Sequence, residues 1–171
     1  MIRTELVHLR EFRKDDLQDV HEYCSQEDVG EMAGWKHHTS LAYTRLILYY
    51  WIKEGYRRAI VTNDTNKVIG HITVNPDEDG RLDVKEIGFV LNRDYQNKGI
   101  VSSLLPLVAK KLFSNGIKAI EAVTYCENIA SQRVLEKCGF KYCGKEEYHS
   151  YELKTTKEVY VYCLEKPADM L

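Results

Sequence analysis

Two periodicities of apolar positions alternate along the chain and predict its elements. An alternation of apolar and polar residues, typical of strands with one buried face, begins in "ELVHLREF". Asn, Asp, Gly and Thr clusters separate the later apolar runs, as expected for turns between strands. We predict strands over residues 5–12, 81–91, 117–125, 140–149 and 158–165, and a two-stranded hairpin over residues 57–75.

Apolar residues spaced three or four positions apart predict four helices. The first begins at Asp15 or Asp16, and the second runs from Thr39 or Ser40 to about residue 54; these side chains are good N-caps. The third helix covers about 98–114 and the fourth 128–137. Pro106 lies inside the third helix and removes one backbone hydrogen bond, which predicts a kink.

The order of elements, β-α-α-β-β-β-α-β-α-β-β, predicts one α/β (α+β) domain over residues 1–171. We expect a mixed, mostly antiparallel sheet of about seven strands with about four helices on its faces. The strand at 81–91 has apolar residues on both faces near its end, so it is expected at the centre of the sheet.

Composition narrows the function classes. The 171 residues are 44% hydrophobic and 29% charged with a net charge of −2, so no global field favours nucleic acid or an anionic membrane. The charged N-terminus predicts no signal peptide and no apolar run has membrane-spanning length, so a cytoplasmic location is expected. The five cysteines form no C-x-x-C pair, and we expect neither a disulfide framework nor a metal site.

The stretch "VLNRDYQNKGIVSSLL" (90–105) joins a strand to a helix through a turn that holds no acidic residue between Gln96 and Gly99. A helix start presents unpaired N–H groups and the positive end of the helix dipole, which together bind anions. Gly99 permits close backbone approach, Lys98 adds a positive charge, and Ser102 offers a hydroxyl. The alternative is a plain strand-to-helix turn. Neither the Walker pattern nor the dinucleotide fingerprint is present, which disfavours nucleotide hydrolysis and hydride transfer.

This stretch resembles the acetyl-CoA signature of the GCN5-related N-acetyltransferase (GNAT) family, Q/R-x-x-G-x-G/A after a central strand. Gln96 and Gly99 match the signature, and Val101 stands where a small residue is usual. The block "ENIASQRVLEKCGF" (127–140) resembles the second half of the family pattern. "LREF" near the start and "GWKHHTS" (34–40) resemble the RimJ/RimL-type branch.

The resemblance implies how acetyl-CoA binds. The central strand is expected to splay from its neighbour, so that its backbone pairs with pantetheine as an added strand would. The turn amides would bind the pyrophosphate, and Asn128 would reach the pantetheine arm in addition to capping its helix. The implied cofactor residues are Phe89, Val90, Leu91, Gln96, Asn97, Lys98, Gly99, Ile100, Val101, Ser102 and Asn128.

Acyl transfer to an amine needs a base for the amine and a proton for the leaving thiolate. Glu86 lies among apolar residues of its strand, where burial raises the pKa of a carboxyl; the alternative is a rim glutamate paired with a lysine. Glu121 and His71 are rival bases, for which a solvated strand position and a structural sheet histidine are the plainer interpretations. By the resemblance, Ser131 is a proton donor to the thiolate; a local helix hydrogen bond is the alternative.

The acceptor side is less well defined. In the family, the loop between the first two helices lines the acceptor cleft, which places Trp35 and His37 near it, with His38, Tyr43, Tyr125 and Tyr148 as further neighbours. The function expected is an acetyl-CoA-dependent N-acetyltransferase acting on a protein or peptide α-amine or on a small amine, by direct attack in a ternary complex. A catalytically silent CoA-binding module and a plain interaction domain are the alternatives. Pairing through the edge of the last strands would give a homodimer.

Overall fold

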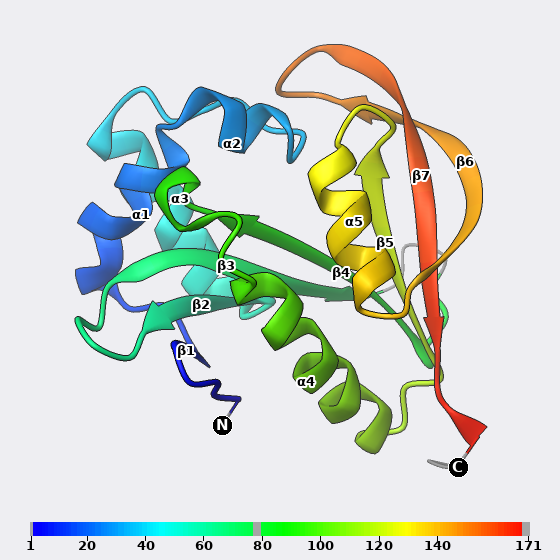
Figure 1. Cartoon of the computed structure of the whole chain (residues 1–171). Coiled ribbons are helices and arrows are strands. Elements are labelled where there is room, and N and C mark those ends of the chain that lie inside the picture. Colours follow the sequence, from blue (N-terminus) through cyan, green and yellow to red (C-terminus); the bar gives the residue numbers. More distant parts are fainter. Residues whose placement is uncertain (1, 77–79, 169–171) are drawn as a thin grey trace.

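The computed structural model describes residues 2–76 and 80–168, and one seven-stranded sheet forms its centre (Figure 1). The strand order is β1-β2-β3-β4-β5-β7-β6, and every neighbouring pair is antiparallel except the parallel pair β4–β5. The mixed, mostly antiparallel sheet predicted from the sequence is confirmed. The strands are β1 (Val7–Arg10), β2 (Arg57–Thr62), β3 (Val68–Pro76), β4 (Val84–Leu91), β5 (Ala119–Tyr125), β6 (Lys141–Ser150) and β7 (Thr155–Glu165).

Five α-helices surround the sheet in the described residues: α1 (Leu17–Cys24), α2 (Glu27–Glu31), α3 (Leu41–Glu54), α4 (Ile100–Ser114) and α5 (Ile129–Lys137). Four match the predicted helices. The fifth, α2, lies between the first two predicted helices and has only five residues, too few to show a helical period. Ser40 and Asn128 cap α3 and α5 as predicted, whereas Asp16 makes no side-chain cap on α1 and instead accepts from the backbone N–H of Arg13 at 2.7 Å.

Helices cover the two faces of the sheet unequally. On one face α4 and α5 pack against the sheet in the larger core, in which Leu104, Leu105 and Leu135 are almost fully buried. On the other face α1, α2 and α3 enclose a second core over β2, β3 and β4. Beyond β4 this second face has less cover, and Val123 of β5 is 41% exposed there. The C-terminal half of the sheet therefore presents one open face.

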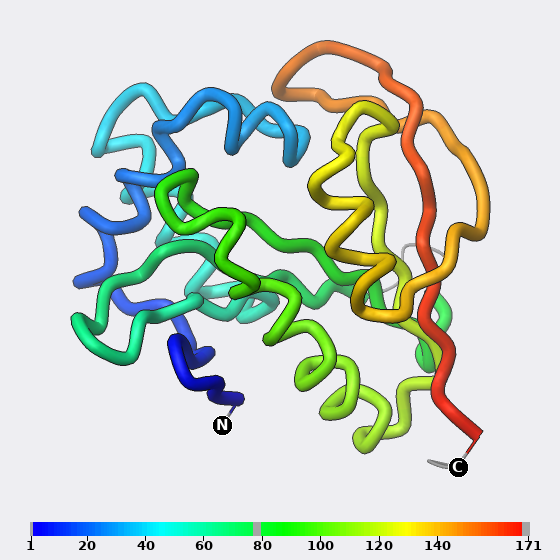
Figure 2. The backbone as a smooth tube through the Cα atoms, viewed as in Figure 1, coloured from blue at the N-terminus to red at the C-terminus, as the bar shows by residue number. Residues whose placement is uncertain are grey.

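The parallel strands β4 and β5 separate after three residue pairs. Val84, Lys85 and Glu86 pair with Ala119, Ile120 and Glu121, and no pair follows. β4 continues beside β3 to Leu91, while β5 continues beside β7 to Tyr125. Figure 2 shows the two strands diverging towards their C-terminal ends. The splay implied by the family resemblance is thus present.

The helix α4 runs without interruption through Pro106. Proline has no N–H, so the carbonyl of Ser102, four residues earlier, loses its helical partner. That carbonyl instead accepts a weak hydrogen bond from the Cys138 thiol at 3.6 Å. The end of α5 therefore lies against the start of α4 and replaces the missing contact.

The last two strands carry a disulfide that the sequence analysis did not expect. Cys143 is the extra residue of a β-bulge in β6, and it is joined to Cys163 of β7 with a Cα–Cα distance of 6.1 Å. The two residues are 20 positions apart, and only the register of the hairpin brings them together.

Two further expectations from the sequence concern a turn between strands and a membrane-spanning segment. The sequence "PDEDG" (76–80) predicts a turn, and residues 77–79 of it lie outside the described residues. Within the described part of the chain, no helix combines the length and apolar character needed to cross a bilayer.

Candidate active site

A cleft of about 1560 Å³ occupies the gap between the splayed strands and extends to both sides of the sheet. Its walls include the predicted catalytic residues Glu86 and Ser131 and the predicted acceptor residue Trp35. The predicted cofactor residues in its walls are Phe89, Val90, Leu91, Gln96, Asn97, Gly99, Ile100, Val101, Ser102 and Asn128. The structure therefore gathers residues from four separate segments around one cavity.

The edge of β4 that faces the gap offers unpaired backbone groups. The N–H of Asn92 donates to Ile69 of β3 at 2.7 Å, and successive residues of a strand point their N–H groups to opposite edges. The N–H groups of Phe89 and Leu91 consequently point into the gap. Gln96 donates its side-chain amide to the Leu91 carbonyl at 3.0 Å, which ties the following turn to the end of the strand. A polar chain can pair with what remains of this edge.

The turn before α4 forms an open cluster of N–H groups. Asn97 and Gly99 have left-handed φ angles of 59° and 72°, which bend the backbone into the helix start. In the described part of the chain, the backbone N–H groups of residues 98–102 have no protein acceptor. Such a cluster at a helix N-terminus binds phosphate groups well.

Two residues of the turn have contacts that the sequence did not predict. Lys98 does not line the cleft: its ammonium donates to the Asp94 carbonyl at 2.8 Å and lies 5.1 Å from the centre of the Tyr95 ring. Its charge is therefore engaged beside the turn. Val101 is 7% exposed and packs within the larger core, so its branched side chain is accommodated by the interior.

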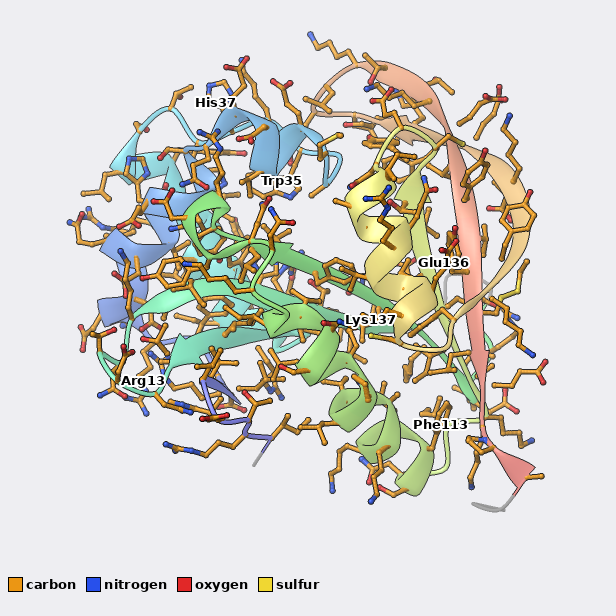
Figure 3. The ribbon with its side chains drawn as sticks, viewed as in Figure 1. Arg13, Trp35, His37, Phe113, Glu136 and Lys137 are labelled. Carbon is orange, nitrogen blue, oxygen red and sulfur yellow. A yellow bond between two sulfur atoms is a disulfide. The ribbon has the colours of Figure 1, made fainter. Side chains whose placement is uncertain are left out.

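The start of α5 forms the opposite wall. The side-chain oxygen Oδ1 of Asn128 accepts from the Ser131 N–H at 3.1 Å, which leaves the side-chain amide nitrogen of Asn128 without an acceptor among the described residues. Helix capping and cofactor binding can thus coexist at Asn128. Arg133 and Lys137, one turn apart on α5, add positive charge to this wall, with Lys137 visible in Figure 3. Their i, i+4 spacing on a predicted helix was the available sequence signal.

Glu86 and Glu121 face each other as the last residue pair before β4 and β5 separate. Glu86 is half-buried and accepts from the Asn75 amide at 3.3 Å. Both carboxylate oxygens of Glu121 lie within 3.0 Å of the Arg81 guanidinium. The sheet therefore places two carboxylates at the base of the cleft, one of them held by an arginine.

His71, the third candidate base, is a structural residue. It is 4% exposed, and its Nδ1 lies 2.9 Å from the Tyr23 hydroxyl. Burial, with smaller contributions from Arg57 and His38, lowers the pKa of His71 to about 3. A group with that pKa is too weak a base for an ammonium near neutral pH.

The two predicted acceptor residues point to different places. Figure 3 shows Trp35 below α2 and His37 above it. Trp35 lines the main cleft, whereas His37 lies in a separate hollow of about 250 Å³, and its acceptor role stays a prediction. The Nδ1 atom of His37 lies 4.0 Å from the Glu31 carboxylate, and a carboxylate oxygen of Glu27 lies within 4.8 Å of the same group. Glu27 is exposed on a helix of five residues, so we assign no metal.

Comparison with known proteins identifies this arrangement. Residues 7–141 match the family model described as an acetyltransferase (GNAT) domain. The chain belongs to the GNAT family. Its homologues are named N-acetyltransferases, so this protein is an acyltransferase of the acetyl-CoA-dependent N-acetyltransferase family.

Individual relatives agree with the family match over almost the whole chain. The uncharacterized N-acetyltransferase YoaA of Bacillus subtilis (strain 168) is 26% identical over 99% of this chain and 98% of its own length. A GNAT-family acetyltransferase from Bacillus anthracis has a crystal structure with a TM-score of 0.85 and 26% identity, covering 96% of this chain and 97% of that one. A spermidine N-acetyltransferase from Vibrio cholerae, solved with CoA and spermine, shares the fold alone at 17% identity, with a TM-score of 0.75 and coverage of 95% and 96%.

Proposed function

We propose that this GNAT protein transfers the acetyl group of acetyl-CoA directly to a primary amine within a ternary complex. The acceptor is a protein or peptide N-terminal α-amine or a small amine. One observation carries the proposal: the gap between β4 and β5 connects the open amides of residues 98–102 to the carboxylates at its base. A cofactor on one side of the sheet and an amine on the other can meet in such a gap.

The residues around the gap fit acetyl-CoA, which supplies the activated acetyl group as a thioester. The turn amides would hold the pyrophosphate, and the free edge at Phe89 and Leu91 would pair with the pantetheine amides. The Leu91 N–H points into the gap and would donate to the thioester carbonyl oxygen as it gains charge, as an oxyanion-hole donor does. Asn128 would contact the pantetheine arm with its free amide nitrogen.

The remaining steps move protons. The amine nitrogen forms a bond to the acetyl carbon, the carbon–sulfur bond breaks, and the sulfur leaves as a thiolate. Glu86, with Asn75 orienting its carboxylate, would accept the proton that the amine loses. The Ser131 hydroxyl would donate to the thiolate from the first turn of α5. We assign the base to Glu86, which Asn75 orients, and keep Glu121, whose two oxygens Arg81 engages, as its rival.

The RimJ/RimL-type motif at residues 34–40 favours a peptide acceptor over a small amine. The second candidate function is a silent CoA-binding module. It predicts acetyl-CoA binding without acetyl transfer to any amine.

The proposal is tested by measuring acetyl transfer to a panel of amines. The two readouts are release of the CoA thiol and the mass of the acetylated amine. Replacing Glu86 by Gln keeps the shape and removes the base, so we expect kcat to fall about 100-fold or more. The acetyl-CoA Kd should stay unchanged. Glu121→Gln is the matched control and should cost less than about ten-fold.

Equal losses in the two variants would contradict the assignment of the base. Acetyl-CoA binding with no transfer by the wild-type protein to any amine would favour the silent module.

A further inference from the structure

Two hydrogen bonds join the two walls of the cleft on its acceptor side. Ser150, 1% exposed, donates its hydroxyl to the Gly34 carbonyl at 2.7 Å and accepts from the Leu153 N–H at 3.0 Å. The Lys36 N–H donates to the Glu152 carboxylate at 3.1 Å. We call residues 34–36 together with 150–152 the strap. In Figure 1 the β6–β7 turn arches towards the loop after α2, where these contacts lie.

A buried tyrosine lies beneath the strap. Tyr125, at the end of β5, is 4% exposed, lines the cleft and packs edge-on against Tyr148 with ring centres 6.2 Å apart. Its hydroxyl has no hydrogen-bond partner among the described residues. A Cβ added to Gly34 would lie 3.2 Å from this hydroxyl, so the strap covers it closely. Buried hydroxyls are almost always paired, and an orphan in a ligand cleft points to a ligand group.

The strap limits what can enter. Gly34 and Trp35 belong to one wall of the cleft, and Tyr148, Ser150 and Glu152 belong to the other. A polypeptide acceptor must extend from the reacting α-amine out of the cleft between these walls, and the strap joins them there. A small amine needs no such exit. It would also meet the aromatic rings of Trp35 and Tyr148, which suit a cation, whereas the Lys157 ammonium already lies 5.1 Å from the centre of the Tyr125 ring.

We infer that the acceptor is a small amine that binds beneath the strap with the Tyr125 hydroxyl as its polar anchor, and that polypeptide N-termini are excluded. This inference rests on the proposed function and chooses between its two acceptor classes. Ser150 acts as a specificity-determining residue because its hydroxyl closes the strap.

The first test compares acceptors. Purified full-length protein with acetyl-CoA is assayed against small amines (spermidine, tyramine, glucosamine and an amino-acid amide) and against hexapeptides with a free Ala or Ser N-terminus. We expect kcat/KM for the best small amine to exceed that for any hexapeptide by about 100-fold or more. Comparable or better transfer to a hexapeptide overturns the inference and leaves the proposed function intact, whereas no transfer to any acceptor overturns both.

The second test opens the strap. Ser150→Ala should raise the ratio of kcat/KM for the hexapeptides to kcat/KM for the small amine about ten-fold. Glu152→Ala removes the hydrogen bond from the Lys36 N–H, and because Glu152 is exposed it leaves no buried cavity. This variant replaces Ser150→Ala in the test if Ser150→Ala folds poorly. Ser114→Ala at the exposed end of α4 is the control, since its hydroxyl bonds only locally to Lys111. An unchanged ratio in both strap variants overturns the inference.

The third test removes only the hydroxyl of Tyr125. Tyr125→Phe should raise KM for the small amine about ten-fold and leave KM for acetyl-CoA unchanged, because the ring still packs. Tyr49→Phe, on the exposed face of α3, is the control. An unchanged acceptor KM in Tyr125→Phe would overturn the anchoring role.

Discussion

Individual residues in this protein show whether a polar group serves the fold or the site. His71 and Gly99 both lie along the cleft. The His71 ring lies among aromatic rings, with its centre 4.7 Å from the centre of the Trp51 ring, and it is hydrogen-bonded to Tyr23. His71 therefore belongs to the core. Gly99 is exposed beside a cluster of open amides, so it belongs to the site.

Gly99 can be tested against a matched glycine. Gly99 and Gly116 both have left-handed φ angles, 72° and 93°, and a Cβ would meet little or nothing at either position. Alanine should therefore lower stability by about 1 kcal/mol at each, through backbone strain alone. Only Gly99→Ala should also weaken acetyl-CoA binding, because only that residue shapes the turn amides. Calorimetry on both variants measures the difference, and equal acetyl-CoA affinities would argue against the phosphate turn.

His71 predicts how stability depends on pH. Its pKa is about 3 in the folded protein, against about 6.5 in an unfolded chain. Between these values the unfolded state binds more protons than the folded state, so stability falls as the pH falls. Through His71, the free energy of unfolding falls by up to about 1.4 kcal/mol for each pH unit below about pH 6.5. Above about pH 6.5, His71 causes no such loss. Urea unfolding of the wild type and of His71→Gln at pH 7 and pH 5 measures it. An identical pH dependence in the variant would contradict this origin.

At the scale of elements, the site depends on where two strands stop pairing. Only three pairs join β4 to β5, and the antiparallel neighbours β3 and β7 hold each strand beyond that point. The separated edges are thus rigid without being paired. A strand edge whose geometry is already fixed loses little conformational entropy when an extended ligand binds along it.

The β6–β7 hairpin adds a covalent link to this half of the sheet. The Cys143–Cys163 bond closes a segment of 20 residues, and a loop of that size predicts a stabilisation of about 3 kcal/mol. Unfolding midpoints measured with and without dithiothreitol should differ in the wild type and coincide in Cys163→Ser. Cys126→Ser, at a free cysteine, is the control and should keep the difference. Two free thiols at Cys143 and Cys163 in the non-reduced protein would contradict the bond.

At the scale of the whole molecule, the two halves of the sheet meet chiefly at β4–β5, and acetyl-CoA would bridge them. The N-terminal half is covered by α1–α3, and the C-terminal half consists of β5, β7 and β6. A ligand held by β4, the α4 turn and α5 contacts both halves only in the folded state. Binding therefore stabilises the fold as a whole.

This linkage has a measurable size. Acetyl-CoA at about 100 times its Kd should raise the free energy of unfolding by about 2.7 kcal/mol, seen as an upward shift of Tm. Desulfo-CoA lacks the thioester but keeps the pyrophosphate, and it should give much of the same shift. An absent shift at saturating acetyl-CoA would argue against binding in the gap.

The sequence by itself determined the strands, four of the five helices of the described residues, the fold class and the turn before α4. These depend on local signals: the periods of apolar residues, caps such as Ser40 and Asn128, and the spacing of Gln96 and Gly99. Each signal lies within one helix, strand or turn. For this reason the seven-stranded mixed sheet could be predicted, and most of the residues predicted for the cofactor lie together in one cleft.

Only the tertiary structure decided which side chains face the cleft and which face the core. His37 and Trp35 are two residues apart and lie in different hollows, Lys98 is engaged beside its turn, and Val101 is buried. The disulfide and the strap join segments 20 and 116 residues apart. Their contacts arise from strand register and from the packing of one loop on another, and no local pattern in the chain encodes either.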